Sequence, residues 1–200
     1  MFTGLVQAVG NVSSISDLGN GKEMIISCSK EFSNDIQIGD SISIDGVCST
    51  ATIKTSTSFN VQYLEETLVK TTMKYIKKGS CVNLEPCLTP STKLGGHIVS
   101  GHIDDTGLIQ SLDYDGEWAI IKISYKEKYR PFLISKGSIA IDGISLTVVD
   151  IEDNWFSCHL IPHTIDHTSL KNKQTGDYVN LEFDQIGKYL YRFYSLDKKK

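Results

Sequence analysis

The stretch Ile141-Asp142-Gly143-Ile144-Ser145-Leu146-Thr147 has an earlier counterpart in Ile44-Asp45-Gly46-Val47-Cys48-Ser49-Thr50, and this pair decides the fold. The two stretches lie 97 residues apart (143 − 46), and the earlier one has a cysteine where the later one has a serine. The same spacing maps Val-Asn-Leu-Glu at 82–85 onto 179–182 without a gap. A repeat of this length predicts two copies of one domain.

Alternation of polar and apolar residues within each copy predicts β-strands. Ser41–Ile44 alternates and is followed by the turn signal Asp45-Gly46, and Phe59–Tyr63 alternates in the same way. Short strands separated by turn residues are typical of closed antiparallel barrels. The chain is therefore expected to be all-β, with further strands over 2–12, 24–26, 82–85, 99–109, 119–124, 138–141, 155–160 and 178–183. Short helices are expected over 65–73 and 162–170, and a short helix or turn over 30–35.

The chain is expected to divide into an N-terminal barrel over 1–88, a linker over 89–97, a C-terminal barrel over 98–186 and a helix with a tail over 187–200. The linker is placed by the stretch 86–96, which carries two prolines and two glycines. The apolar residues 186–196 have no counterpart in the repeat and predict a helix that packs on a partner subunit. Lys198–Lys200 is expected to be a frayed end.

Composition excludes several classes of function. Forty per cent of the 200 residues are hydrophobic, the net charge is −4 and the pI is near 5.7, which argues against electrostatic binding of nucleic acid. No apolar run approaches the length of a membrane span, and the first residues do not form a signal peptide. The five cysteines include no Cys-x-x-Cys pair, so free thiols in a reducing cytoplasm are expected.

Nucleophile-capable side chains follow each Asp-Gly turn, at Cys48 and Ser145. They can equally be packing residues, and the sequence shows no general base beside either one. His102 lies opposite Leu5 in the repeat and Lys136 lies opposite Gly39, so each is specific to the second copy.

A metal site is conceivable where histidines recur every fourth residue, at His159, His163 and His167. Pro162 interrupts a continuous helix there, and no cysteine or carboxylate completes a ligand set. We therefore expect no metal. The sequence also lacks a phosphate-binding glycine loop, so nothing in it indicates a nucleotide cofactor.

Several longer motifs, taken together, resemble the riboflavin synthase family of the α-chain type. They are Met-Phe-Thr-Gly-Leu-Val at 1–6, Asp-Gly-Val-Cys at 45–48, Gly-Gly-His-Ile-Val-Ser-Gly-His-Ile at 95–103, Lys-Gly-Ser-Ile-Ala-Ile-Asp-Gly-Ile-Ser-Leu-Thr at 136–147, Leu-Ile-Pro-His-Thr at 160–164 and Val-Asn-Leu-Glu-Phe-Asp at 179–184. The resemblance implies two tandem six-stranded Greek-key barrels, each binding one 6,7-dimethyl-8-ribityllumazine. It implies a dismutation in which one lumazine gives a four-carbon unit to the other, yielding riboflavin and 5-amino-6-ribitylaminouracil without cofactor or metal. A homotrimer is implied as well, and an association with lumazine synthase is left open.

The resemblance also implies which residues form two pockets. Catalytic roles would fall to Phe2, Ser41, Cys48, His102, Ser145 and Asp184. The first pocket would be lined by Gly4, Leu5, Val6, Cys48, Ser49, Thr50, Gln62, Tyr63, Leu64, Glu65, Glu66 and Thr67. The second would be lined by Gly101, His102, Ile103, Lys136, Ser145, Leu146, Thr147, His159, Leu160, Ile161, Pro162, His163 and Thr164.

Individual roles follow as hypotheses. His102 and Ser145, oriented by Asp184, would handle protons in the second pocket, and Cys48 supported by Ser41 would assist addition of a nucleophile in the first. Two other readings compete with this one. A non-catalytic lumazine- or flavin-binding protein would have the same two barrels, whereas a flavin-dependent reductase would need a further nucleotide-binding domain for which the chain has no room.

Overall fold

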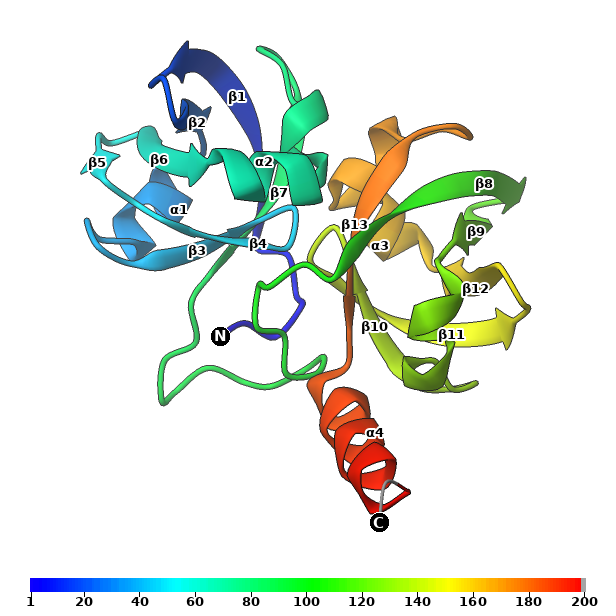
Figure 1. The fold of residues 1–200 in the computed structure, drawn as a ribbon. Coiled ribbons are helices and arrows are strands. Elements are labelled where there is room, and N and C mark those ends of the chain that lie inside the picture. The colour runs from blue at the N-terminus through cyan, green and yellow to red at the C-terminus, as the bar shows by residue number, and fades with distance from the viewer. Residues whose placement is uncertain (199–200) are drawn as a thin grey trace.

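The computed structural model describes residues 1–198 and shows two β-domains side by side, with a helix projecting from the second (Figure 1). The first domain contains one short α-helix, α1, between its second and third strands, and α2 with the 3-10 helix η1 before its last strand. Its elements are β1 (Ala8–Asp17), β2 (Gly21–Ser27), α1 (Lys30–Asp35), β3 (Ser41–Ile44), β4 (Val47–Thr50), β5 (Ile53–Lys54), β6 (Ser58–Leu64), α2 (Glu65–Lys70), η1 (Thr72–Tyr75) and β7 (Cys81–Pro86).

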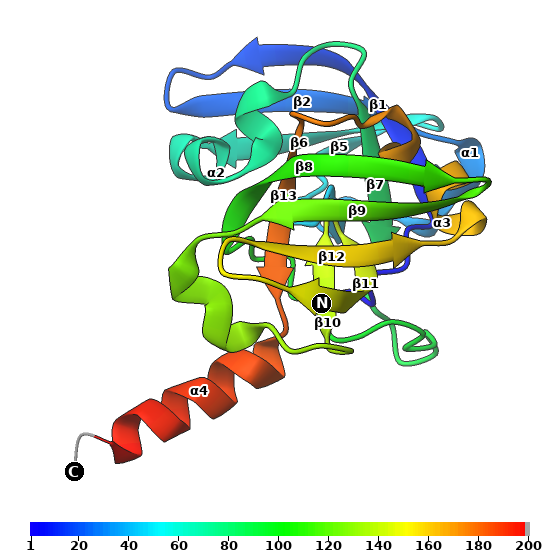
Figure 2. The same ribbon diagram turned by 90° about the vertical axis from the view of Figure 1, so that its right-hand side faces the viewer.

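The second domain repeats this order and ends in the longest helix, α4. Its elements are β8 (Asp105–Asp115), β9 (Trp118–Ser124), η2 (Glu127–Phe132), β10 (Ser138–Ile141), β11 (Ile144–Ile151), β12 (Trp155–Leu160), α3 (Pro162–Asp166), η3 (Ser169–Asn172), β13 (Tyr178–Phe183) and α4 (Gln185–Asp197). Figure 2 shows α4 leaving the barrel at the end of β13.

Strand pairing confirms the expected all-β architecture. The second domain is a closed barrel in the order β10-β11-β12-β9-β8-β13. The first domain has the order β4-β3-β7-β1-β2-β6-β5, so its edges are β4 and β5. These two strands are separated only by Ala51 and Thr52 and together correspond to the continuous strand β11. The first domain is therefore the same six-stranded barrel with one strand broken in two.

Each domain has its own core of inward-facing apolar side chains, as the period-two pattern predicts. Phe59, Met24 and Ile26 are fully buried in the first, and Phe156, Ile121 and Ile123 in the second. A third, smaller cluster lies between the domains.

Several predicted boundaries were wrong. The strands expected to begin at residues 2 and 99 begin at Ala8 and Asp105 instead. The two expected longer helices each break into an α-helix and a 3-10 helix. Thr71 and Thr168 cause the break, because each hydroxyl donates to a carbonyl four residues back and accepts the amide two residues ahead.

The two domains meet across a pseudo-twofold axis. The Gly46 turn and the equivalent Gly143 turn lie back to back, and a Cβ on either glycine would come within 2.8 Å of the other's amide nitrogen. The side-chain amide of Asn83 donates to the Asp142 carbonyl (2.9 Å), and that of its equivalent Asn180 donates to the Asp45 carbonyl (2.8 Å). These are the turns that precede Cys48 and Ser145, so the interface fixes both at once.

Buried carboxylates make this interface sensitive to pH. Burial, with a further contribution from Asp142, raises the pKa of Asp45 from its ordinary 3.8 to about 8, although Lys173 acts in the opposite direction. The folded chain therefore holds a proton that the unfolded chain releases across this range, and the free energy of unfolding should fall as the pH rises from about 4 towards 8.

Urea unfolding at several pH values measures this slope. The variant Asp45→Asn, whose amide oxygen can still accept the Asn83 amide, should flatten the slope. An unchanged slope in that variant would show that Asp45 is ionised throughout.

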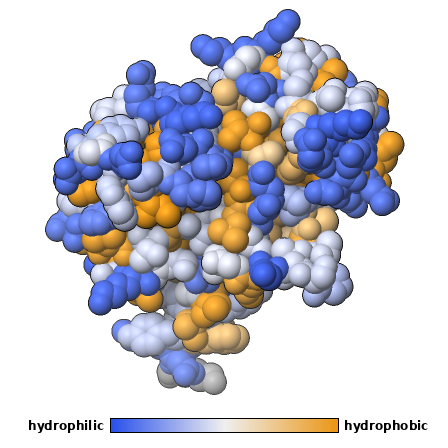
Figure 3. All heavy atoms as spheres, turned by 180° about the vertical axis from the view of Figure 1, so that it is seen from behind, coloured by the Kyte–Doolittle hydropathy of each residue, from blue (hydrophilic) through white to orange (hydrophobic). Residues whose placement is uncertain are grey.

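Helix α4 exposes apolar and aromatic side chains, among them Leu190, Phe193 and Tyr194. Figure 3 shows hydrophobic surface in orange at the bottom of the molecule, where this helix projects. Among residues 1–198, no helix is long and apolar enough to cross a membrane. The tail residues Lys199 and Lys200, predicted to fray, lie outside the described residues.

Candidate active site

Two glycine segments cross between the domains and build the site. The Gly4 carbonyl, in the first repeat, accepts a hydrogen bond from the Ser145 amide of the second (2.8 Å), and the Gly101 carbonyl of the second accepts one from the Cys48 amide of the first (2.8 Å). Both glycines have positive φ, +77° and +82°. A Cβ on Gly4 would lie 2.6 Å from the Cβ of Ser145, and the same distance separates Gly101 from Cys48. Only glycine fits these two contacts.

Each crossing segment is held by a buried glutamate. Glu85 accepts the amides of Thr3 (2.7 Å) and Gly4 (3.0 Å), and Glu182 accepts those of Ser100 (2.7 Å) and Gly101 (2.9 Å). The hydroxyls of Thr3 and Ser100 donate to the same carboxylates. The glutamate of the repeated Asn-Leu-Glu motif thus anchors the chain where it crosses to the other domain.

Glu182→Gln tests this anchor. The substitution removes the charge that strengthens three hydrogen bonds, so we expect the free energy of unfolding to fall by about 2 kcal/mol, measured in urea. Glu117→Gln, at an exposed turn, is the matched control and should change little. Equal stability of both variants would contradict the anchoring role.

The crossing corrects the predicted grouping of pocket residues. Val6 packs against the core of the second barrel, and Ile103 packs against the core of the first. Gly4, Leu5 and Val6 therefore belong with Ser145, whereas Gly101, His102 and Ile103 belong with Cys48. His102 is thus an exposed side chain beside the first site, not the partner of Ser145 in the second.

Strand alternation divides the remaining candidates into two sets. In β4, Cys48 and Thr50 face outwards while Ser49 is buried, and β11 repeats this with Ser145 and Thr147 outside. Four candidates direct their side chains into the barrel interiors and offer a ligand on the outer face only their backbone groups: Ser49, Tyr63, Leu146 and Leu160. The outward set at the first site is Cys48, Thr50, Gln62, Leu64, Glu65, Glu66 and Thr67, and at the second it is Ser145, Thr147, His159, Ile161, Pro162, His163 and Thr164.

The second site contains a residue that the sequence did not single out. Nδ1 of His97 lies 2.7 Å from the Ser145 hydroxyl, so an imidazole nitrogen stands within hydrogen-bond distance of this serine. The His97 amide donates to the Thr3 carbonyl, and a Cβ on the preceding Gly96 would strike both that carbonyl and Ser145. The Gly-Gly-His run was the available signal, because two glycines allow the backbone to close over Ser145.

Burial favours the neutral form of this histidine. Burial lowers the pKa of His97 below its ordinary value of 6.5, while the carboxylates of Asp184 and Glu182 act in the opposite direction. Asp184 is the N-cap of α4, where its Oδ1 accepts the Ile186 amide (2.9 Å). It therefore lies near enough to influence His97 while also fixing the start of the helix.

Lys136 and Phe2 have different surroundings. Lys136 is exposed and adopts φ of 65°, at the turn position where the first repeat has Gly39 with φ of 94°. A non-glycine residue in this conformation costs stability, which favours a functional reason for the lysine. Phe2 is fully buried against Val99 and Cys48, so it can position the first site but is not exposed to a ligand.

Ser41 pairs with Thr50 across the β3–β4 ladder, which places it at the edge of the first site.

The three spaced histidines do not form a metal cluster. His159 lies in β12, whereas the rings of His163 and His167 stack on each other. Among residues 1–198, no group of three or more potential ligands is close enough to hold a metal ion.

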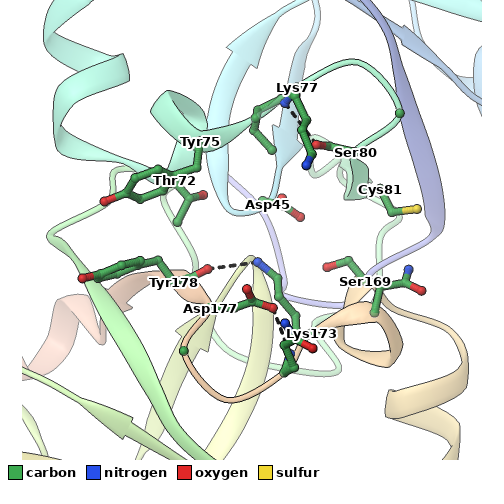
Figure 4. A pocket seen from close by; sticks show the side chains of 15 residues that line it. Asp45, Thr72, Tyr75, Lys77, Ser80, Cys81, Ser169, Lys173, Asp177 and Tyr178 are labelled. Carbon is green, nitrogen blue, oxygen red and sulfur yellow. Dashed lines mark hydrogen bonds between the residues drawn. The ribbon is translucent and has the colours of Figure 1, made fainter.

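A cleft of about 730 Å³ lies elsewhere. It opens between the domains beside Asp45 and Lys173, next to the stacked rings of Tyr75 and Tyr178 (Figure 4). None of the predicted pocket residues lines it. At the predicted sites, outward side chains such as Thr50 and Thr147 are exposed in the single chain.

Two barrels with equivalent outward faces, completed by crossed glycine segments, define a protein with a duplicated ligand-binding domain. The family model of the lumazine binding domain matches residues 3–86 and 100–184. The chain is 43% identical over 195 residues to riboflavin synthase of Actinobacillus pleuropneumoniae, covering 96% of this chain and 89% of that one. It is 38% identical over 193 residues to riboflavin synthase of Bacillus subtilis strain 168, with coverages of 96% and 89%. The chain belongs to the riboflavin synthase family and is an enzyme of that family.

Solved structures show the same fold. LumP complexed with 6,7-dimethyl-8-(1'-D-ribityl) lumazine superposes with a TM-score of 0.83 at 20% identity, covering 92% of this chain and 99% of that one. LumP complexed with riboflavin gives 0.86 at 21% identity, with the same coverages.

Proposed function

We propose that the chain catalyses the dismutation of two 6,7-dimethyl-8-ribityllumazine molecules to riboflavin and 5-amino-6-ribitylaminouracil. The observation that carries this proposal is the pair of equivalent but chemically different sites on one chain. A reaction between two identical molecules needs two related binding faces, and each face must treat its ligand differently. Cys48 opposite Ser145, and Leu5 opposite His102, supply that difference.

At the first site, Cys48 and Thr50 on β4, Gln62 on β6 and the crossing His102 would contact one lumazine. Cys48 and Ser41 would assist nucleophile addition at C7, and Phe2 would hold Cys48 in place from beneath. At the second site, Ser145 and Thr147 on β11 would contact the other lumazine, with His159, Thr164 and Lys136 around it. Bringing two bound molecules into line supplies most of the advantage of such a bimolecular step.

Turnover tests the proposal directly. The purified chain is incubated anaerobically with 6,7-dimethyl-8-ribityllumazine and EDTA, and riboflavin is followed by absorbance. One riboflavin and one diaminouracil for every two lumazines consumed is the expected result. Tight binding of lumazine without riboflavin would instead support the alternative, a non-catalytic lumazine-binding protein.

The proposal includes a homotrimer, because outward side chains at both sites are exposed in the single chain. The exposed apolar side chains of α4 would provide contacts between chains. Leu190→Asp, at a side chain 65% exposed, should shift sedimentation velocity towards the monomer. Arg192→Asp, also on α4, is the control. A trimer that persists in Leu190→Asp would remove α4 from the interface.

Free thiols at all five cysteines fit the reducing cytoplasm that we propose as the location of the chain.

A further inference from the structure

His97 pairs with Ser145 at the second site, whereas Cys48, the counterpart of Ser145 in the repeat, has different surroundings. The side chain of His97 is 9% exposed, and its Nδ1 forms a 2.7 Å hydrogen bond with the Ser145 hydroxyl. At the equivalent point of the first site, Cys48 packs against the apolar side chains of Phe2 and Val99.

The geometry restricts what this pair can do. Nε2 of His97 is buried and has no hydrogen-bond partner among residues 1–198, so within them the bond to Ser145 is what fixes the ring. With the proton on Nε2, Nδ1 accepts from the Ser145 hydroxyl. The two carboxylates with electrostatic influence on the ring, those of Asp184 and Glu182, favour its protonated form. A neutral imidazole with anions nearby is suited to accept a proton and then keep it briefly.

We propose that His97 is the proton acceptor behind Ser145, which makes the second site the one where the C7 methyl group of a lumazine is deprotonated. This inference rests on the proposed function. The methyl C–H bond breaks and its electron pair stays on carbon, delocalised into the electron-poor ring. The proton passes to Ser145 Oγ as the serine's own proton passes to His97 Nδ1. The imidazolium later returns its proton through Ser145 to a nitrogen of the departing diaminouracil.

In this scheme His97 both orients the Ser145 hydroxyl and accepts its proton. The test must therefore separate the positioning role from the proton-accepting role. His97→Asn places an amide where Nδ1 lies, which keeps a hydrogen bond to Ser145 but cannot take up a proton. His97→Gln is a second variant in case the first fails to fold. His167→Gln is the control, since His167 is an exposed histidine assigned to neither site, whose ring stacks on His163 and whose Nδ1 hydrogen-bonds the His163 carbonyl.

Two readouts are measured on each variant. The first is anaerobic riboflavin formation from pH 5.5 to 9. The second is exchange of the C7 methyl protons for deuterium, followed by ¹H NMR of the lumazine in excess over the enzyme. We expect His97→Asn to lower kcat about 100-fold with little change in KM, to remove the acid limb of the pH profile and to slow exchange in parallel. His167→Gln should match the wild type.

The exchange readout separates failure of the inference from failure of the proposed function. If the wild type forms no riboflavin but accelerates exchange in a His97-dependent way, the dismutation is wrong and the inference stands. If the wild type forms riboflavin and His97→Asn keeps its rate, pH profile and exchange, the inference is overturned. If the wild type accelerates neither, both are overturned.

Discussion

Gly4→Ala is expected to lower riboflavin formation more than 100-fold while leaving two folded barrels. The new Cβ would lie 2.6 Å from the Ser145 Cβ and 2.9 Å from the Ser145 amide nitrogen. The crossing segment must then move away from β11 and break the hydrogen bond from Ser145 to the Gly4 carbonyl. A shift of about 1 Å in a catalytic constellation is enough to cost roughly 100-fold in rate.

Gly19→Ala is the matched control for that experiment. Gly19 has φ of +82°, close to that of Gly4, but a Cβ there meets no atom within 4 Å. It therefore carries the same backbone strain without the clash, and should lose some stability but no activity. If Gly4→Ala turned over at the rate of Gly19→Ala, the contact with Ser145 would be irrelevant to the reaction.

Lys173→Met is expected to cause the largest loss of stability, about 3–5 kcal/mol in the free energy of unfolding at pH 8. Nζ of Lys173 lies 3.1 Å from Oδ2 of Asp142, which is fully buried, and it also faces Asp45. The first repeat has Ile76 at the equivalent position, so one cation serves both buried carboxylates. Removing it leaves two buried acids beside each other without compensation.

Urea unfolding measures this loss, and pH provides an internal check. Burial raises the pKa of Asp142 as well as that of Asp45, so lowering the pH from 8 to 5 favours the protonated form of both acids and the loss should shrink. The double variant Lys173→Met with Asp142→Asn should recover most of the stability at pH 8. A loss that is the same at both pH values would show that the lysine acts by packing alone.

The fold could be predicted from the sequence because its turn signals and strand patterns are local and occur twice. The Ile-Asp-Gly turns, the alternation of Ser41–Ile44 and the Val-Asn-Leu-Glu strands occur twice at one spacing, and each confirms the other. The alternation also held a signal that the predicted pocket lists did not use. In a strand, neighbours of outward-facing Cys48 and Thr50 must face inwards, so Ser49 could have been assigned to the core.

The assembly of the sites was beyond the sequence. A repeat shows that Gly4 and Gly101 are equivalent. It does not show whether each glycine segment lies against its own barrel or crosses to the other one, because the spacing of the repeat is the same in both cases. His97 lies 48 residues from its partner Ser145 and outside the repeat, so no pattern links the two. Such contacts are set by how the domains pack and not by either domain alone.

The number of riboflavin molecules bound per chain is the most direct measure of the two proposed sites. Two crossed and equivalent faces predict that one chain binds two molecules of riboflavin, the unreactive product, in equilibrium dialysis. Thr50→Lys on the first face and Thr147→Lys on the second, both at exposed outward positions, should each reduce the count to one and together to none. If the chain bound one riboflavin and either substitution alone abolished that binding, the chain would not have two independent sites. That result would also contradict a dismutation between ligands at two sites.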